Sequence, residues 1–330
     1  MKLKCLILTV LISLIGCSNE QQSEQLGFVT NGVGSFWVIA SKGVEHAAKE
    51  FSVQTEVHMP AEGVSDQKRI IQTLLARGID GIAVSPIDPE NQTDLLNEAA
   101  ANTFLITHDS DAPNSNRLCF IGIDNYSAGR ECGKLVKEAL PDGGNLMIFV
   151  GRLEQLNAQQ RRQGVIDELM NRSFQPTRRD PNDAPISNDK YTIIDTRTDQ
   201  FDYAKAKSQV EDAIAKYPQL DGVIGLFAYN PPMALKAIKE AGKINQIKII
   251  AFDEEDETLQ GIMDGHIYGT VVQNPYQYGY ESVRILAGLA RGDQSVLPPE
   301  GYLDIPARKI THDNVEKFWS NLKDLTGKTN

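Results

Sequence analysis

The sequence predicts an α/β protein of two similar open lobes, each built on a parallel sheet covered by helices on both faces. From residue 26 onward, short apolar runs alternate with stretches whose apolar residues recur at helical spacing. Repeated strand–helix units of this kind form parallel sheets. Residues 80–109 and 221–253 also form a weak internal repeat. Each starts with Asp-Gly and an apolar strand, continues through a Pro-bearing turn and a helix, and ends in a strand followed by Asp. The repeat indicates two lobes in tandem.

Elements in the first part of the chain are predicted to alternate between strand and helix. The strands are short apolar runs, whereas the helices are longer and have one apolar face. The helix expected at 36–51 illustrates this, because its apolar residues stand at 36, 40, 44, 47, 48 and 51. In order from a first strand, the predicted elements are 26–30, 36–51, 53–59, 65–77, 81–85, about 92–101 and 104–107.

The alternation restarts after Asn125, this time with a helix first. The predicted elements are, in order, 127–140, 145–150, 158–171, 191–195, 203–216, 222–226, 233–241 and 247–252. Residues 172–190 interrupt the pattern and are rich in Pro, Asn, Asp and Arg, which predicts a surface insertion.

The ends of two equivalent strands predict a binding site. In open α/β sheets, ligands lie outside the carboxyl ends of the strands, and Asp109 and Asp253 each follow such a strand, one in each lobe. If the lobes face each other, both carboxylates point into one cleft. His108 precedes the first of them, but neighbouring side chains on a strand point oppositely, so we expect no chemical role for it. The acidic residues 254–257 are expected to form a solvated helix start, where the helix dipole favours acids.

The turn after the first strand, VTNGVGSFW at residues 29–37, contains Gly-x-Gly and so raises the alternative of a dinucleotide site. That fingerprint needs a third glycine, whereas this position is Trp37, and the adjacent rings of Phe36 and Trp37 would obstruct a pyrophosphate. A sugar fits such a turn better, since flat rings cover its C–H faces while charged and amide groups bond its hydroxyls. We expect one ring to belong to the core and the other to touch the ligand, with Phe36 the better candidate.

The first residues, MKLKCLILTVLISLIGCSNEQQSEQ, predict export. Two lysines precede an apolar run at 5–15 that is too short to span a bilayer, which is typical of a signal peptide at 1–16. The run ends in Leu-Ile-Gly-Cys, which resembles a bacterial lipobox and implies cleavage before Cys17 and lipidation of its thiol. The alternative is an ordinary signal whose cysteine is incidental. Residues 17–25 would then be a tether that holds a water-exposed body to a membrane surface through lipid.

Composition limits the class of partner. A net charge of −11 on 330 residues argues against nucleic acid as a partner, because phosphates need a basic face. The scattered cysteines and histidines show no metal-ligand spacing. We therefore expect no nucleic acid, metal or cofactor. Cys119 and Cys132 could pair in an oxidising compartment. Two buried free thiols are our expectation, because one falls in a strand-like run and the other in a helical one.

A series of short motifs, in a fixed order, resembles the periplasmic sugar-binding proteins of the ribose-binding type. The motifs are FVTNGVGSFWVIASKG, FLITHDSD, FIGIDNYSAGRECG, Asn-Ala-x-x-Arg-x-x-Gly at 157–164, LFAYNPPMALKAIKEAG, IIAFDE and GTVVQNPYQYGY. The resemblance covers residues 26 to about 310. It implies two Rossmann-like lobes joined by a three-segment hinge, the type 1 periplasmic binding protein fold. The first lobe would comprise 26–123 and 274–303, and the second 124–273 and 305–323.

The resemblance also implies a set of ligand contacts, in which rings stack on a sugar and polar side chains bond its hydroxyls. The implied residues are Thr30, Phe36, Trp37, Asp109, Asn157, Arg161, Phe201, Asn230, Asp253 and Gln273. Two positions depart from the ribose pattern: Gly34 stands where ribose binders carry Asn, and Ser110 where they carry Arg. The site should therefore have more room and different donors, and its ligand need not be ribose.

The function implied by the resemblance is that of the solute-binding component of an ABC-type sugar importer. Two lobes would close on one pentose or hexose on the periplasmic side of a bacterial membrane, with Cys17 as the anchor. The partners would be the monosaccharide and an ABC permease, and we expect a monomer. The alternative within the same fold is a sugar-sensing protein that feeds a receptor.

Two other classes are disfavoured. An enzyme would need a cofactor fingerprint or an acid/base pair. Asp109 and Asp253 could form such a pair, as in glycoside hydrolysis, but the carboxylates of the family bind free sugars. A repressor of the lactose-repressor type would need an N-terminal helix-turn-helix, and the signal segment occupies that place.

Overall fold

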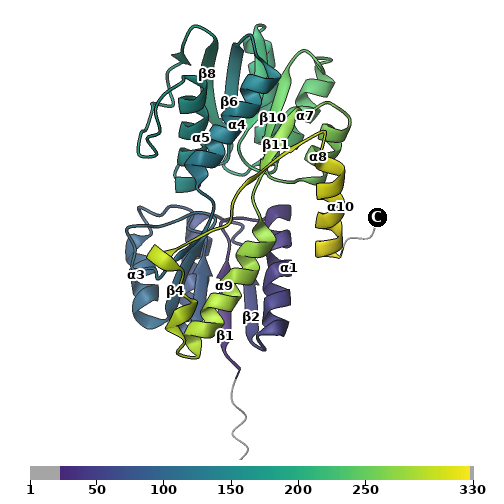
Figure 1. Ribbon diagram of the computed structural model, residues 1–330. Coiled ribbons are helices and arrows are strands. Elements are labelled where there is room, and N and C mark those ends of the chain that lie inside the picture. Colours follow the sequence, from purple (N-terminus) through teal and green to yellow (C-terminus); the bar gives the residue numbers. More distant parts are fainter. Residues whose placement is uncertain (1–22, 328–330) are drawn as a thin grey trace, which may run out of the picture.

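The computed structural model describes residues 23–327. The predicted signal peptide at 1–16, the lipidation site Cys17 and most of the tether at 17–25 lie outside these residues. The described chain forms two lobes, one above the other in Figure 1. No helix within residues 23–327 is long and apolar enough to cross a membrane.

The first lobe takes its elements from two parts of the chain. Residues of the first part form β1 (Gln25–Val29), α1 (Ser35–Glu50), β2 (Gln54–His58), α2 (Val64–Ala76), β3 (Gly81–Val84), α3 (Thr93–Asn102), β4 (Phe104–His108) and β5 (Phe120–Gly122). The chain returns later with α9 (Pro275–Ala290), the 3₁₀ turns η1 (Gln294–Val296) and η2 (Pro299–Gly301), and β12 (Tyr302–Asp304). The strand order is β12-β5-β4-β3-β1-β2, and every pairing is parallel.

The second lobe begins with α4 (Asn125–Ala139), β6 (Gly144–Val150), α5 (Leu156–Leu169), β7 (Ile186–Ser187), β8 (Tyr191–Thr198), α6 (Tyr203–Lys216) and β9 (Leu220–Gly225). It continues with α7 (Asn230–Glu240), β10 (Lys248–Phe252), α8 (Asp256–Met263) and β11 (Gly269–Val272), and it ends with β13 (Arg308–Thr311) and α10 (Val315–Thr326). The strand order is β13-β11-β10-β9-β6-β8-β7, in which only the edge strands β7 and β13 pair antiparallel. The predicted α/β fold with two parallel-stranded lobes is confirmed.

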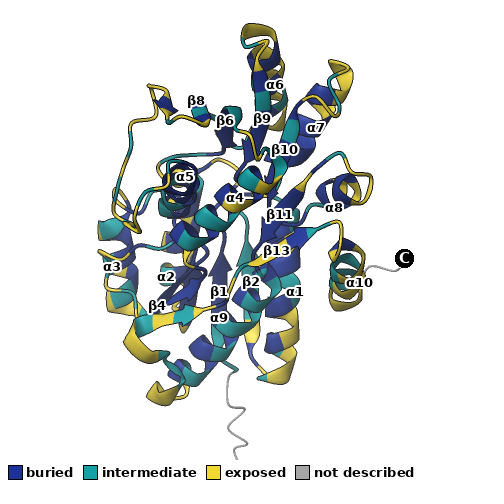
Figure 2. Cartoon of the chain, turned by 45° about the horizontal axis from the view of Figure 1, so that its top comes forward, coloured by how far each residue is buried: buried dark blue, intermediate teal, exposed yellow. Residues whose placement is uncertain are grey.

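The central strands of each sheet are buried on both faces, as Figure 2 shows by the dark centre of each lobe and the lighter outer faces of the helices. Strand β10 is an example, because residues 249–252 are all fully buried. Such strands consist of continuous apolar runs because helices cover both sides of the sheet. Residues 172–190 are largely exposed and irregular apart from β7, as expected for a surface insertion.

The chain passes between the lobes at three places: between β5 and α4, between β11 and α9, and between β12 and β13. These connections run close together in Figure 1, since β12 pairs with β5 and β13 pairs with β11. They place the strand ends of the two sheets opposite each other.

Helices α4 and α5 of the second lobe cross so closely that their backbones are in contact. This contact fixes the position of α5, the helix that carries Arg161. A Cβ added at Gly129 would lie 2.2 Å from the carbonyl oxygen of Arg161, and one added at Gly164 would lie 2.1 Å from that of Tyr126. Only glycine permits such an approach. Helices α1 and α9 of the first lobe cross in the same manner.

Both cysteines of the described chain are buried free thiols, so this expectation is confirmed. Cys119 lies just before β5 in the first lobe and Cys132 lies in α4 of the second. Burial raises the pKa of Cys119 to about 11 and that of Cys132 to about 12. Neither thiol therefore reacts readily at neutral pH, because the thiolate is the nucleophile.

Candidate functional site

A cleft of about 450 Å³ lies between the two lobes, where the strands of both sheets end. Most of the predicted site residues line it, namely Phe36, Trp37, Asp109, Asn157, Arg161, Phe201, Asp253 and Gln273. The sequence-based rule that ligands lie beyond strand ends therefore located the cleft correctly.

Asp109 and Asp253 occupy equivalent positions, directly after β4 and β10. Both have a left-handed backbone, with φ of 58° and 66°. This conformation is uncommon for residues other than glycine and clusters at functional sites. It turns the chain away from each strand at the point where the carboxylate enters the cleft.

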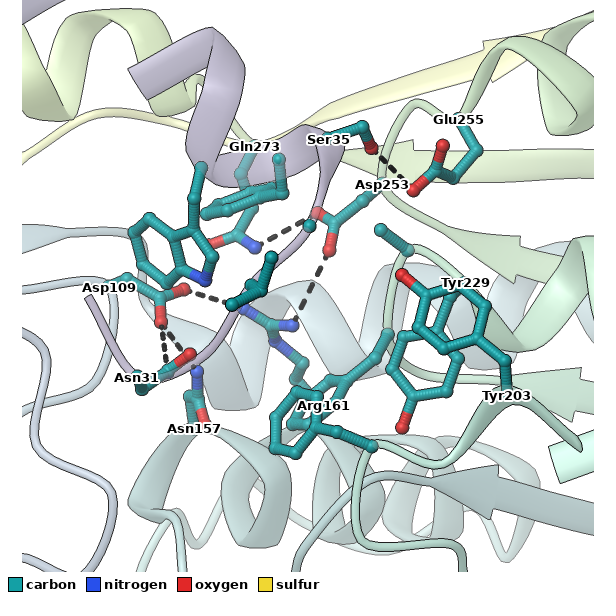
Figure 3. Close-up of a pocket in the computed structure, with 17 residues that line it drawn as sticks. Asn31, Ser35, Asp109, Asn157, Arg161, Tyr203, Tyr229, Asp253, Glu255 and Gln273 are labelled. Atoms are coloured by element: carbon teal, nitrogen blue, oxygen red, sulfur yellow. Dashed lines mark hydrogen bonds and ion pairs between the residues drawn. The ribbon is translucent and has the colours of Figure 1, made fainter. Parts of the chain in front are cut away.

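Arg161 of α5 lies between the two carboxylates (Figure 3). Its Nη2 is 3.6 Å from Oδ1 of Asp109, and its Nη1 is 3.8 Å from Oδ2 of Asp253. The guanidinium is held by donating from Nε to Asn125 Oδ1 at 2.8 Å and from Nη1 to the carbonyl oxygen of Leu226 at 3.2 Å. Arg161 is only 1% exposed, so one buried cation is shared by two carboxylates from opposite lobes.

Asp109 is held by donors from both lobes. Its Oδ2 accepts from Asn31 Nδ2 at 3.1 Å, from Ser85 Oγ at 3.0 Å and from Asn157 Nδ2 at 3.2 Å. Asn31 and Ser85 belong to the first lobe and Asn157 to the second, so this oxygen joins the lobes. Burial raises the pKa of Asp109, although Arg161 and the three donors act in the opposite direction.

Asp253 is oriented by a hydrogen-bonded chain. Its Oδ1 accepts from Gln273 Nε2 at 2.9 Å, and Gln273 Oε1 in turn accepts from the Tyr278 hydroxyl at 3.0 Å. The tyrosine therefore fixes which end of the amide faces Asp253. Burial is the main reason that the pKa of Asp253 is raised, with Arg161 and Gln273 opposing it. Two carboxylates whose charge is only partly offset can accept strong hydrogen bonds from the hydroxyls of a ligand.

Aromatic rings cover both sides of the cleft. On the first lobe, Phe36 and Trp37 meet edge to face at 4.8 Å, and Trp37 also packs on Phe28 of the core. On the second lobe, Phe201 stacks on Phe227 with ring centroids 5.5 Å apart. Phe36 and Trp37 thus both line the cleft and both pack into the core of the first lobe.

Thr30 and Asn230, also predicted as contacts, do not line the cleft. The Thr30 hydroxyl donates to the carbonyl oxygen of Gly32 at 2.7 Å and so closes the turn after β1. Asn230 donates from Nδ2 to Asp199 Oδ2 at 2.8 Å and accepts from the backbone N–H of Phe227 at 3.1 Å. Both side chains are buried behind the lining.

His108 is fully buried and stacks on Phe28 with ring centroids 4.1 Å apart. Burial lowers its pKa to about 3. The ring is thus a neutral part of the core, as the alternation of side chains along the strand predicted.

The expectation that residues 254–257 are a solvated helix start is wrong for Glu254, whereas Glu255 is the N-cap residue of α8 and is half-buried. Glu254 is only 5% exposed. Glu255 lines the cleft, and its Oε1 accepts from the Ser35 hydroxyl of the first lobe. Helix α8 begins at Asp256, so only Asp256 and Glu257 lie in its first turn.

Sequence reasoning missed several other lining residues. No signal in the sequence marks Val33 or Ala228 as a lining residue. Tyr203, Phe227 and Tyr229 were also missed, although they follow strands of the second lobe. Applying the strand-end rule to every strand, rather than to the two that end in Asp, would have found Phe227 and Tyr229 after β9.

Two sister lobes that supply carboxylates and rings to one cleft define a two-lobed ligand-binding protein. Within residues 23–327, no three side chains of His, Cys, Asp or Glu are grouped to hold a metal ion.

Comparison with known proteins places the chain in a family. The family model for the periplasmic binding protein domain matches residues 26–294, and the chain belongs to this family. It is 22% identical to the ribose import binding protein RbsB of Escherichia coli K12 over 89% of this chain and 94% of that protein. It is 25% identical to a xylitol-binding protein of Mycolicibacterium smegmatis over 93% and 86%.

Among solved structures, a solute-binding protein from Burkholderia graminis in complex with D-arabinose is similar, with a TM-score of 0.79 and 25% identity over 89% of this chain and 96% of that one. The predicted resemblance to periplasmic sugar-binding proteins of the ribose-binding type is thereby confirmed.

Proposed function

We propose that the protein is the solute-binding component of an ABC-type importer and that its ligand is a pentose or hexose. One observation carries the proposal: Asp109 and Asp253, from opposite lobes, share Arg161 at the base of a cleft lined by aromatic rings. Carboxylates and a guanidinium bond hydroxyls strongly, and flat rings cover the faces of a sugar. The relatives named for ribose and xylitol, and the structure that held D-arabinose, support the same class of ligand.

Binding would proceed by closure of the lobes about the three connecting segments, near 123–124, 273–274 and 303–305. The first lobe, 26–123 and 274–303, offers Asp109 and Phe36. The second, 124–273 and 305–323, offers Arg161 and Asp253. A ligand that bonds both carboxylates stabilises the closed form, because an open form presents only half of these groups to it. The closed form is then what the permease recognises, and the sugar leaves unchanged.

Titration calorimetry on the chain without its predicted signal peptide, residues 17–330, tests the function. With a panel of pentoses, hexoses and their alditols, we expect at least one ligand to bind with micromolar or tighter affinity and to be recovered unaltered by NMR. The proposal fails if no member of the panel gives heat or raises the melting temperature.

We further propose that Cys17 carries the lipid anchor and that the body is a monomer. The apolar run that ends in Leu-Ile-Gly-Cys supports the anchor. The Cys17→Ala variant should appear in the soluble fraction of the producing cells, whereas the unaltered chain partitions with membranes and takes up radiolabelled fatty acid. Cys5→Ala, inside the signal, is the matched control and should leave the anchor intact. Retention of Cys17→Ala in the membrane, with undiminished fatty-acid label, would contradict the assignment.

A further inference from the structure

One wall of the cleft presents carbon rather than polar atoms, because its polar groups are turned away. Asp199 lies behind this wall and is fully buried. It accepts from the Tyr229 hydroxyl and from the backbone N–H of Phe201 at 2.9 Å through Oδ1, and from Asn230 Nδ2 at 2.8 Å through Oδ2. One carboxylate therefore withdraws three donors that could otherwise have met a ligand.

Four lining residues beside Asp199, namely Phe201, Phe227, Ala228 and Tyr229, form a surface that we call the ring wall. Tyr203 lines the cleft at its edge, stacks on Tyr229, and places its hydroxyl near Gly34 of the first lobe. Phe201 lies 5.5 Å from Phe227 and 5.7 Å from Tyr229 between ring centroids. Phe227 and Tyr229 are 7% and 5% exposed, so the rings are packed and not free to turn. The ring wall is continuous carbon apart from backbone atoms.

The opposite end of the cleft is polar. It holds Asp109, Arg161 and Asp253, and the Arg161 guanidinium carbon stands 5.7 Å from the Phe227 ring centroid, where the two surfaces meet. The polar pair at the mouth, Ser35 and Glu255, is already bonded across the cleft. Figure 3 shows the carboxylates gathered around Arg161 and the tyrosine rings on the other side.

A free hexose carries hydroxyls around its whole rim. A cleft with one polar end and one apolar wall therefore does not suit it. A hydroxyl placed against the ring wall would give up water without a partner, which is costly. A methyl group in the same place would gain by burial. Building on the proposed sugar-binding function, we propose that the preferred ligand is a 6-deoxyhexose, whose hydroxyls face the carboxylates and Arg161 and whose methyl group meets the ring wall.

Matched sugar series test this proposal. D-arabinose, L-fucose and L-galactose share one pyranose ring and differ only in carrying hydrogen, methyl or hydroxymethyl at the same carbon. The series L-arabinose, D-fucose and D-galactose, and L-lyxose, L-rhamnose and L-mannose, vary in the same way. In at least one series, the methyl sugar should bind about tenfold or more tightly than both its partners, the scale for one methyl group or one unpaired hydroxyl in an apolar pocket.

A variant of the ring wall locates the methyl group. Ala228→Ser places a hydroxyl in the wall and should reduce the preference for the methyl over the hydroxymethyl sugar by about fivefold or more. Ala241→Ser, at the exposed end of α7, is the matched control and should leave the preference unchanged. Melting curves of both variants verify that they fold.

The outcomes separate the two levels of the proposal. If hydroxymethyl or unsubstituted sugars bind as tightly as the methyl sugar in every series that binds, the deoxy preference is refuted and sugar binding stands. An unchanged preference in folded Ala228→Ser would refute the placement of the methyl group on this wall. If no sugar binds at all, the proposed function falls, and the present proposal with it.

Discussion

Replacing Arg161 by Met should lower the free energy of unfolding by about 3–5 kcal/mol, the cost of removing one partner from a buried ion pair. The guanidinium lies within 4 Å of Asp109 and of Asp253, and all three side chains are buried. Methionine has a similar length and no charge, so the variant leaves two carboxylates facing each other without the shared cation. Urea unfolding measures the loss, and calorimetry should find that sugar binding is abolished as well.

The destabilisation of Arg161→Met should depend on pH in a defined direction. Burial already raises the pKa of both aspartates above the ordinary value of 3.8, and loss of the cation raises it further. An acid whose pKa is higher in the folded than in the unfolded state contributes stability below its unfolded pKa and loses it as the pH rises through the folded pKa. The deficit relative to the unaltered protein should therefore be larger at about pH 8 than at about pH 5.

Arg162→Met is the matched control for this experiment. Arg162 is the next residue, is also buried, and donates to the carbonyl oxygens of Asp180 and Pro181 and to the hydroxyl of Thr196. Its loss should destabilise the protein without the growing deficit at alkaline pH. A deficit of Arg161→Met that is the same at both pH values would show that the carboxylates do not depend on Arg161.

Replacing Asp253 by Ala should weaken sugar binding by about 1.5–3 kcal/mol or more, the scale for a hydrogen bond to a charged group. This corresponds to a loss of roughly 10- to 150-fold in affinity. The free energy of unfolding should fall by less than the free energy of binding, because the charge that is removed is itself costly to bury. Calorimetry and a melting curve on the same sample separate the two effects.

Glu257→Ala provides the comparison for Asp253→Ala. Glu257 is acidic, follows four residues later and is exposed in the first turn of α8. Its removal should leave the affinity unchanged. If Asp253→Ala binds sugar as the unaltered protein does, the binding site has been placed in the wrong part of the cleft.

The sequence allowed the fold and the two ends of the cleft to be predicted because both depend on patterns along the chain. Continuous apolar runs mark strands that are covered on both faces, and the helix predicted at 203–216 coincides with α6. Strands β7, β12 and β13 were not predicted, because two to four residues at a sheet edge show no periodicity. Strand β11 and the helices α9 and α10 were not among the predicted elements either. Asp109 and Asp253 were identifiable because they close repeated units.

The sequence could not reveal the direction in which the side chain at a motif position points. The resemblance placed Asn230 among the ligand contacts, but Asp199, which no motif singled out, draws its amide away from the cleft. Glu254 and Glu255 were indistinguishable from a solvated acidic run until the turn after β10 buried one and directed the other across to Ser35. Such choices depend on neighbours that are distant in the sequence.

The crossing of α4 and α5 means that residues outside the cleft determine the position of the Arg161 guanidinium. With no room for even a methyl group at Gly129 against the Arg161 carbonyl, any larger residue would push α5 outward and draw the guanidinium away from both aspartates. Larger residues at this helix junction should therefore impair binding, although no ligand contacts them. Diversification towards new sugars is then left to the rings and the turn after β1, while the helix junction stays constant.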